Sequence, residues 1–533
     1  MANNYKALKE AFVSNLTGGT VLEINKITLV APAAVLLWSI LQSRHDVFKP
    51  YNVAAYITDF LLNCGAILLA TTLYSSEPLL LNGLIILPAV AAFLSNPSSN
   101  PQASPSKPPV KSGPKDATPK DVQDPLPIKP FVTSYRGTMM IITCIAILAV
   151  DFKVFPRRFG KVENWGTSLM DLGVGSFVFS AGVVSARSVL KQRLLPKDST
   201  RVAKGLLQRL SLSARHSFPL LVLGLIRLFS VKGLDYAEHV SEYGVHWNFF
   251  FTLAFVPPAV ALFQDALDML PSPTLLPLLL GAGYQMALDS TDLKAYILTA
   301  PRTDLLSQNR EGVFSFVGYL AIFLAGQATG IHVLPRSSKR AKAERWADED
   351  WWLAQTGMAS AKTDTRSSFS KGIHAAREAF DDLRSWTLGS LAMWSVVWVV
   401  LYVSTTSYYG ANIPVSRRLA NLPYLLWVAA FNCCQLTLFC AIETYVFPGL
   451  YKRGGKEMEK QRCSEATSKV LHAFNRNGLA IFLLANVLTG LVNLTLPTLE
   501  MGDTPAVVVL MGYIGVLCGV ALGLDHFDVS LKL

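Results

Sequence analysis

The chain has 533 residues, of which 51% are hydrophobic and 16% charged, and its mean hydropathy is positive. Soluble globular chains carry nearer a quarter charged residues, so this composition excludes an ordinary soluble domain. The net charge of +11 does not indicate nucleic-acid binding, because the Lys and Arg residues lie in a few loops between apolar runs and no nucleic-acid motif accompanies them.

The apolar residues cluster in runs that approach the roughly 20 residues a membrane-spanning helix needs. We therefore predict an all-α, polytopic integral membrane protein, a bundle of about 13 transmembrane helices in one domain over residues 1–533. The eighth span is the least regular, because Pro271, Pro273 and Pro277 crowd its start. In chain order the predicted spans are 24–42, 53–74, 79–95, 137–152, 168–187, 214–231, 245–266, 273–289, 311–331, 386–404, 420–446, 473–496 and 504–525.

Neither a metal site nor a cleavable leader is predicted. The seven cysteines are odd in number and show no CxxC or Cys/His metal spacing. Six lie in apolar runs, where a cysteine acts as a small hydrophobic residue. The polar N-terminus leads into a long apolar run, which is expected to serve as an uncleaved signal-anchor.

Three long connections differ in composition. Residues 96–130 are rich in Pro, Ser and Lys, which predicts a disordered cytosolic loop. Residues 332–385 form a charged cytosolic loop that also holds Trp346, Trp351 and Trp352, a mixture that favours an amphipathic helix on the membrane surface. Residues 449–470 are basic.

Loop charge predicts the orientation. Basic residues crowd the connections after spans three, five, nine and eleven, whereas those after spans two and twelve have no Lys or Arg. Because cytoplasmic loops carry the excess of Lys and Arg, the N-terminus should be lumenal and the C-terminus cytosolic. Lys6 and Lys9 speak weakly against this orientation.

One connection breaks the charge pattern. Residues 151–161 follow the fourth span, on the predicted lumenal side, and carry Lys153, Arg157, Arg158 and Lys161. Arg157 and Arg158 suit an anionic group, because a guanidinium can donate two hydrogen bonds to a phosphate. A solvated loop, or a loop among lipid headgroups, is the alternative.

Asp151 ends a run that is otherwise apolar from Met139 to Val150. Burial raises the pKa of a carboxyl group, and carboxylates at membrane depth are rare enough to suggest function. Because the chain turns at Pro156 and returns to Lys161, the two charged groups could meet at the mouth of a cavity. A structural ion pair is the alternative.

The fifth span begins with a polar turn. Thr167 or Ser168 can cap the helix, and Asp171 then lies in or near the first turn, where the helix dipole favours an anion. Gly173 and Gly175 allow close approach of another helix or of an acyl chain.

His246, at the entrance of the seventh span, could be a general base, although a histidine in such a place is more often an interfacial, hydrogen-bonded side chain. No Gly-rich phosphate loop, GxSxG elbow or HExxH motif is found. Further polar residues in apolar surroundings are Glu23, Asn25, Asp59, Asn63, Glu77, Arg227, Glu443, Asn486 and Asn493.

These segments resemble the glycosylphosphatidylinositol (GPI) inositol acyltransferase family, whose fungal members are the GPI-anchored wall transfer proteins. The most specific motif runs from Asp151-Phe-x-x-Phe-Pro-Arg-Arg-Phe-x-Lys161 into Glu163-x-Trp-Gly-Thr-Ser-Leu-Met-Asp171-Leu-Gly-Val-Gly-Ser. The resemblance covers nearly the whole chain apart from residues 96–130. It includes segments that begin at Gly18, Tyr74, Tyr243, Pro301, Arg417 and Asn477.

The resemblance implies an O-acyltransferase of the endoplasmic-reticulum membrane. Such enzymes transfer a fatty acyl chain, usually palmitoyl from palmitoyl-CoA, to the inositol 2-hydroxyl of glucosaminyl-phosphatidylinositol during GPI-anchor synthesis. The acid and lysine of the family motif correspond to Asp151 and Lys161. Asp151 would be the general base, and Lys161 would stabilise the charge that develops on the thioester carbonyl or orient Asp151.

The expected partners are acyl-CoA, the inositol lipid and membrane lipid, with palmitoyl-CoA as a substrate and no permanently bound cofactor or metal. A lipid or solute transporter is the runner-up, although no internal repeat supports it. A scaffold that docks partners through residues 332–385 is a third hypothesis. The expected substrate-binding residues are Arg157, Arg158, Glu163, Asp171, His246 and Asn248.

Overall fold

A computed structural model of the chain describes residues 2–96, 124–193, 205–232, 240–270, 272–336, 386–451 and 455–531. Within these ranges the protein is helical, apart from an isolated bridge between Gly19 and Thr167. The predicted all-α fold is therefore confirmed. Most of residues 96–130 and 332–385, with the predicted amphipathic helix, lies outside the described residues.

Among the described residues, nine helical segments are long and apolar enough to cross a membrane, which makes the protein a polytopic helical membrane protein. A tenth candidate is α9 (Leu206–Lys232), which bends by 48° between Arg215 and Ser217. The nine segments are α2 with α3 (Val21–His45), α4 through the π-helix η1 (Leu61–Gly65) to α5 (Val53–Thr71), α7 (Pro130–Ala149), α8 (Leu169–Arg193), α15 (Arg310–Val333), α18 (Thr387–Thr406), α19 (Leu422–Val446), α22 (Gly478–Thr495) and α23 (Asp503–His526).

A helix lies at each of the other three predicted spans. These helices are α6 (Pro78–Leu94), α11 (Phe249–Met269) and α12 (Leu275–Ser290). With 17 residues, α6 is about 25 Å long, less than the roughly 30 Å of a bilayer's hydrocarbon core. The count of thirteen crossings is therefore not confirmed.

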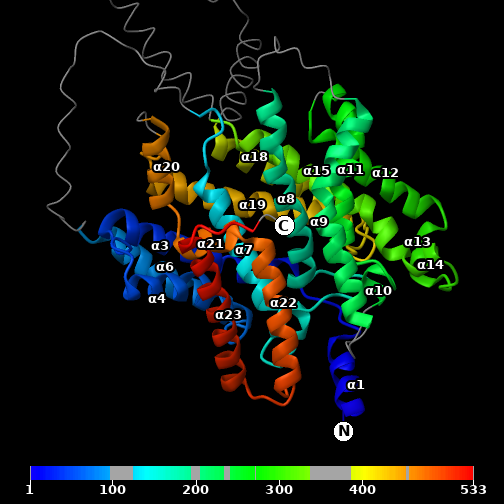
Figure 1. Cartoon of the computed structure of the whole chain (residues 1–533), viewed down its shortest axis with the longest axis horizontal. Coiled ribbons are helices and arrows are strands. Elements are labelled where there is room, and N and C mark those ends of the chain that lie inside the picture. The colour runs from blue at the N-terminus through cyan, green and yellow to red at the C-terminus, as the bar shows by residue number, and fades with distance from the viewer. Residues whose placement is uncertain are drawn as a thin grey trace, which may run out of the picture.

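Short helices occupy the connections and the N-terminus. In Figure 1, α1 lies near the turn that joins α22 to α23, and Lys9 of α1 bonds to Asn493 close to the end of α22. The basic connection 449–470 contains one of these short helices, α20. The short helices are α1 (Ala2–Val13), η3 (Arg157–Phe159), α10 (Val240–Tyr243), α13 (Leu293–Thr299), α14 (Leu305–Gln308), α20 (Gly455–Glu465) and α21 (Lys469–Arg476).

The connections gather into two sets. In the first, Arg336 after α15 pairs with Glu459 of α20 at 2.7 Å, and its backbone N–H donates to Pro125 O before α7. In the second, the N-terminal segment bonds to the connection after α7, through Gly19 N and Thr167 O at 2.8 Å. This is the grouping that the charge pattern predicts, although the compartment that each set faces stays a prediction.

Helix α8, which carries the second half of the motif, packs closely against α15. A Cβ atom on Gly182 would lie 2.0 Å from the carbonyl oxygen of Phe323, and one on Gly326 would lie 2.0 Å from that of Phe179. Any larger residue would push the backbones apart, so these glycines set the distance between the two helices. The first turn of α8 is thereby held in place relative to α15.

Candidate functional site

The motif loop is anchored by three phenylalanines. Helix α7 ends at Ala149, and Phe152, Phe155 and Phe159 then turn inward and are almost completely buried. The rings of Phe155 and Phe159 meet edge to face, with centroids 5.6 Å apart. The spacing Phe-x-x-Phe-x-x-x-Phe therefore buries one side of the loop and leaves its charged residues at the edge.

Asp151, directly after α7, is held by one neutral hydrogen bond. Asn493, near the end of α22, donates from Nδ2 to Asp151 Oδ2 at 2.7 Å. Lys9 of α1 reaches the same amide, with Nζ 2.9 Å from Asn493 Oδ1. Burial raises the pKa of Asp151, and the Asn493 hydrogen bond and the charge of Lys9 oppose that rise in part.

Lys161 does not pair with Asp151. Its ammonium bonds to both carboxylate oxygens of Glu242 on α10, at 2.8 and 2.9 Å. The expectation that Asp151 and Lys161 meet directly is therefore wrong, and so is the alternative of a structural ion pair between them. Each has a partner of its own from a distant part of the sequence.

A buried arginine links the partner of Lys161 to α8. Arg417 donates from Nη1 to Glu242 at 3.1 Å and from Nε to Asp171 at 2.6 Å. Asp171 also accepts the backbone N–H of Val162, at 3.0 Å. The backbone next to Lys161 and the ammonium of Lys161 are thus held by one network of two carboxylates and one guanidinium.

The first turn of α8 is capped as predicted. Ser168 Oγ accepts the backbone N–H of Asp171 at 3.1 Å and donates to its carboxylate at 2.7 Å. Ser168 thereby satisfies one of the backbone N–H groups that the first turn of a helix leaves free. It aims Asp171 at the motif loop and at Arg417.

Arg157 and Arg158 both have partners within the chain. Arg158 Nε pairs with Glu23 of α2 at 2.5 Å. The guanidinium of Arg157 lies 5.0 Å from the centre of the Phe12 ring. Both stay near the surface of the loop, and neither contacts Asp151 or Lys161 in the described structure.

The remaining predicted site residues have local roles. Glu163 uses its backbone N–H, which donates to Leu16 O at 3.1 Å. His246 Nε2 lies 3.2 Å from Gln308 Oε1. Asn248 Oδ1 accepts the backbone N–H of Phe250 at 3.0 Å, so this side chain caps the start of α11.

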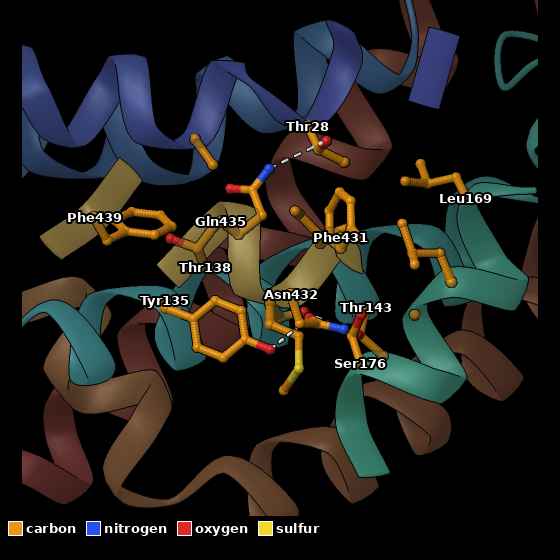
Figure 2. A pocket seen from close by; sticks show the side chains of 15 residues that line it. Thr28, Tyr135, Thr138, Thr143, Leu169, Ser176, Phe431, Asn432, Gln435 and Phe439 are labelled. Atoms are coloured by element: carbon orange, nitrogen blue, oxygen red, sulfur yellow. Dashed lines mark hydrogen bonds between the residues drawn. The ribbon is translucent and has the colours of Figure 1, made fainter. Parts of the chain in front are cut away.

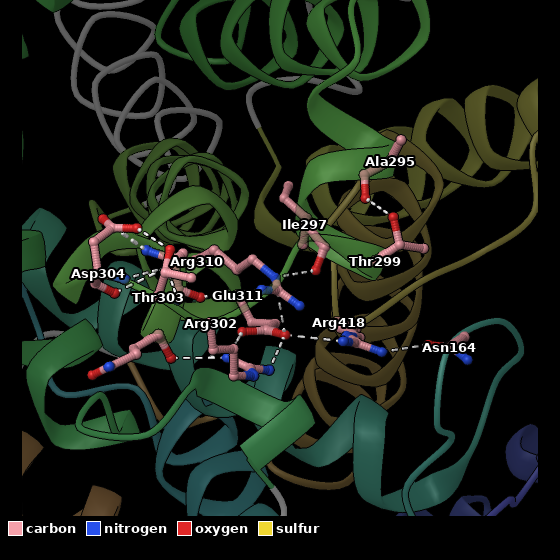
Figure 3. A network of polar contacts seen from close by, with 12 residues as sticks. Asn164, Ala295, Ile297, Thr299, Arg302, Thr303, Asp304, Arg310, Glu311 and Arg418 are labelled. Carbon is pink, nitrogen blue, oxygen red and sulfur yellow. Dashed lines mark hydrogen bonds and ion pairs between the residues drawn. The ribbon is translucent and has the colours of Figure 1, made fainter.

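A second charged network, which sequence reasoning missed, supports the motif loop from the other side (Figure 3). Glu311, fully buried in the first turn of α15, pairs with Arg302 at 2.6 Å and Arg418 at 2.9 Å. Arg418 also donates to Asn164 Oδ1 of the motif loop at 2.6 Å. The loop from Lys161 to Thr167 is therefore held by Arg418 directly, through Asn164, and by Arg417 through Asp171 and Glu242.

An open pocket lies between α2, α3, α7, α8 and α19 (Figure 2). Leu169 and Ser176 mark one end of it, and Tyr135 and Phe439 the other. The two glycines of α8 differ here: Gly173 lines the pocket and a Cβ atom on it would meet nothing within 4 Å, whereas one on Gly175 would lie 2.4 Å from Val428. The lining of the pocket is largely apolar, and the pocket is open rather than enclosed.

Comparison with known proteins supports the whole-chain resemblance. A sequence profile of the GWT1 family matches residues 5–524. GPI-anchored wall transfer protein 1 of Aspergillus oryzae is 53% identical and that of Aspergillus fumigatus 54%, over 100% of this chain and 100% and 99% of those proteins. The protein of the same name from Saccharomyces cerevisiae is 39% identical over 99% of both chains. The chain therefore belongs to the GWT1 family of GPI-anchored wall transfer proteins.

Proposed function

We propose that the protein is an acyl-CoA-dependent O-acyltransferase of GPI-anchor biosynthesis. It would transfer a palmitoyl chain to the inositol 2-hydroxyl of glucosaminyl-phosphatidylinositol in the endoplasmic-reticulum membrane. The observation that carries the proposal is Asp151, a half-buried carboxylate at a helix end whose pKa is raised and which has one neutral hydrogen-bond partner. A carboxylate whose pKa is raised is a stronger base than an ordinary aspartate, which suits a general base.

The proposed reaction uses Asp151 twice. Its carboxylate takes the proton of the inositol hydroxyl, whose oxygen attacks the carbonyl carbon of the thioester. Lys161 stabilises the negative charge on the carbonyl oxygen of the tetrahedral intermediate. The carbon–sulfur bond then breaks, and the departing coenzyme A thiolate takes the proton from Asp151. The products are the acylated inositol and coenzyme A.

The apolar pocket is the proposed seat of the acyl chain. It runs along α7 toward the end that carries Asp151, and Thr143 on its wall lies about two helical turns before Asp151. Gly173→Leu should fill the space that Gly173 leaves open, and so raise KM for palmitoyl-CoA with little loss of stability. Gly175→Leu is the matched control and should destabilise the protein through its clash with Val428.

The proposed contacts with the polar parts of the substrates come from the motif loop and the residues near it. Arg157 and Arg158 would hold a phosphate of coenzyme A or of the inositol lipid, with Glu163, Asp171, His246 and Asn248 around the acceptor. In this proposal the motif loop is lumenal and the basic connections are cytosolic. Cysteine accessibility tests this topology: labelling of residues 157–161 and of residue 191 from the same side would overturn it.

Acyl transfer by purified protein tests the function. The wild type should consume palmitoyl-CoA and acylate an inositol lipid, and Asp151→Asn should do so far more slowly. The competing hypothesis, a transporter, predicts movement of lipid or solute across a vesicle membrane without consumption of acyl-CoA. A wild-type protein that leaves acyl-CoA intact would overturn the proposal.

A further inference from the structure

The amide of Asn493 has a defined orientation. Its Oδ1 lies 2.9 Å from the ammonium of Lys9 and 3.4 Å from the hydroxyl of Thr498, both of which donate hydrogen bonds. Its Nδ2 lies 2.7 Å from Asp151 Oδ2. Turning the amide over would place Nδ2 against the two donors and a carbonyl oxygen against a carboxylate, so this network permits one orientation only.

The two carboxylate oxygens of Asp151 differ in their hydrogen bonding. Oδ2 accepts the hydrogen bond from Asn493. For Oδ1, no hydrogen bond is recorded within the described parts of the chain. A general base needs this asymmetry, because one oxygen must be fixed while the other receives the proton.

We infer that Asn493 is a positioning residue for Asp151: its amide, oriented by Lys9 and Thr498, holds one carboxylate oxygen and presents the other to the acceptor hydroxyl. This inference rests on the proposed function. It assigns a role to a residue of α22 that is 342 residues distant from Asp151 in sequence. Asn493 itself does not touch the reacting atoms.

The groups around Asp151 also determine when it can act as a base. Lys9 of α1 is the charged group that acts on it, while Asn493 and Thr498 are neutral. Donation from Asn493 favours the ionised carboxylate, against the burial that disfavours it. Loss of this donor should therefore leave Asp151 protonated up to a higher pH.

Titration of the Asp151 carboxyl group tests the inference without turnover. The infrared absorption of its protonated C=O group can be assigned by difference from Asp151→Asn and followed with pH. Asn493→Leu removes the donor at nearly the same size, and Asn493→Asp keeps the shape. The matched control is Asn486→Leu, because Asn486 is half-buried on the same helix and, among the described residues, its side chain bonds to the Phe482 carbonyl of its own helix.

In Asn493→Leu the midpoint should rise by about one to two pH units, the value of one hydrogen bond to a charged group. In Asn493→Asp it should rise at least as far, because a second carboxylate then faces Asp151. The acid limb of the kcat/KM profile should move with it, whereas Asn486→Leu should leave both unchanged. Such shifts of the midpoint and of the acid limb differ from the effect of a simple loss of folded protein, which lowers activity equally at every pH.

Unmoved midpoints in both Asn493 variants, together with an inactive Asp151→Asn, would overturn the role of Asn493 and leave the proposed function standing. An Asp151→Asn protein with full acyl-transfer activity would overturn the proposed function of Asp151, whatever the infrared titration shows. The two failures are therefore distinguishable. Should Asn493→Leu not fold, Asn493→Asp decides the question, because Lys9 and Thr498 can still donate to its carboxylate.

Discussion

Asp151 and Lys161 lie ten residues apart in one loop, yet their surroundings differ. Within the part of the chain that the structure describes, the Asp151 carboxylate has the neutral donor Asn493 and is influenced by the cation Lys9. Lys161 is joined to a chain of alternating charges through Glu242, Arg417 and Asp171. A lightly held carboxylate can gain and lose a proton at little structural cost, whereas a cation in such a network is held in place.

The two halves of the motif therefore have different tasks. The first half of the loop, up to Pro156, supplies a group whose protonation can change. The second half, from Lys161 to Asp171, supplies a rigid electrostatic frame. The predictions below test this division.

The largest effect is expected from Asp151→Asn. The amide keeps the size of the side chain but cannot act as a base, so turnover should fall by about 10²–10⁴-fold while the protein stays folded. Lys161→Ala should cause a comparable loss, and the double variant should be little worse than either single one. Acyl-transfer rates per folded molecule are the measurement. Full activity of Asp151→Asn would show that the reaction does not need a proton-accepting group at residue 151.

Arg417→Met should affect folding more than chemistry. It leaves the carboxylates of Asp171 and Glu242 without their shared counter-ion, and breaking a buried pair in this way costs about 3–5 kcal/mol. Thermal unfolding in detergent is the measurement, and Asp151→Asn is the control, which should unfold near the wild-type temperature. Equal stability of the two variants would contradict the idea of a rigid frame.

The two acids should respond to pH in opposite directions. Burial alone would raise the pKa of Glu242, but the charges of Lys161 and Arg417 outweigh it and lower the pKa from 4.5 to about 2. Its stabilising contribution is therefore present above about pH 4.5 and is lost as the pH falls toward 2. For Asp151, whose pKa is raised, stability is lost instead as the pH rises through the folded-state pKa.

Unfolding temperatures over this pH range test the difference. Glu242→Gln should flatten the acid side of the stability curve relative to the wild type, and Asp151→Asn should leave the acid side unchanged. If the wild type and Glu242→Gln have the same acid side of the stability curve, Lys161 and Arg417 do not hold Glu242 ionised.

Arg158 should have the smallest effect on stability. Its pair with Glu23 is partly exposed, and such pairs contribute about 0–1 kcal/mol. If Arg158 holds a substrate phosphate, Arg158→Ala should mainly raise KM for one substrate, and Arg158→Lys should not fully restore it. An unchanged KM for both substrates would leave Arg158 as a residue of a solvated loop.

Local features of the site could be predicted because they depend on neighbouring residues. The end of the apolar run before Asp151, the cap at Ser168 and the place of Asp171 in the first turn all follow from short-range pattern. The capping role of Asn248 could also have been recognised, since an Asn directly before an apolar helical run is a typical N-cap.

The partners of the charged residues could not be predicted in this way. Glu242 is 81 residues from Lys161, and Arg417 is 246 residues from Asp171. Hydrophobic periodicity identifies which residues face the membrane or the core, but it does not pair one connection with another. The sequence alone suggests Asp151, in the same loop, as the partner of Lys161, whereas the structure shows Glu242 in that place.

The bond between Asn493 and Asp151 has a consequence for biosynthesis. At about 5–20 residues per second, a ribosome needs roughly 17–70 s to add the 342 residues that separate them. During that time Asp151 is already made while its amide partner is not. A nascent chain thus carries an unfinished site until its penultimate helix has been synthesised, and a chain truncated before Asn493 would insert its earlier helices but keep a carboxylate with nothing to orient it.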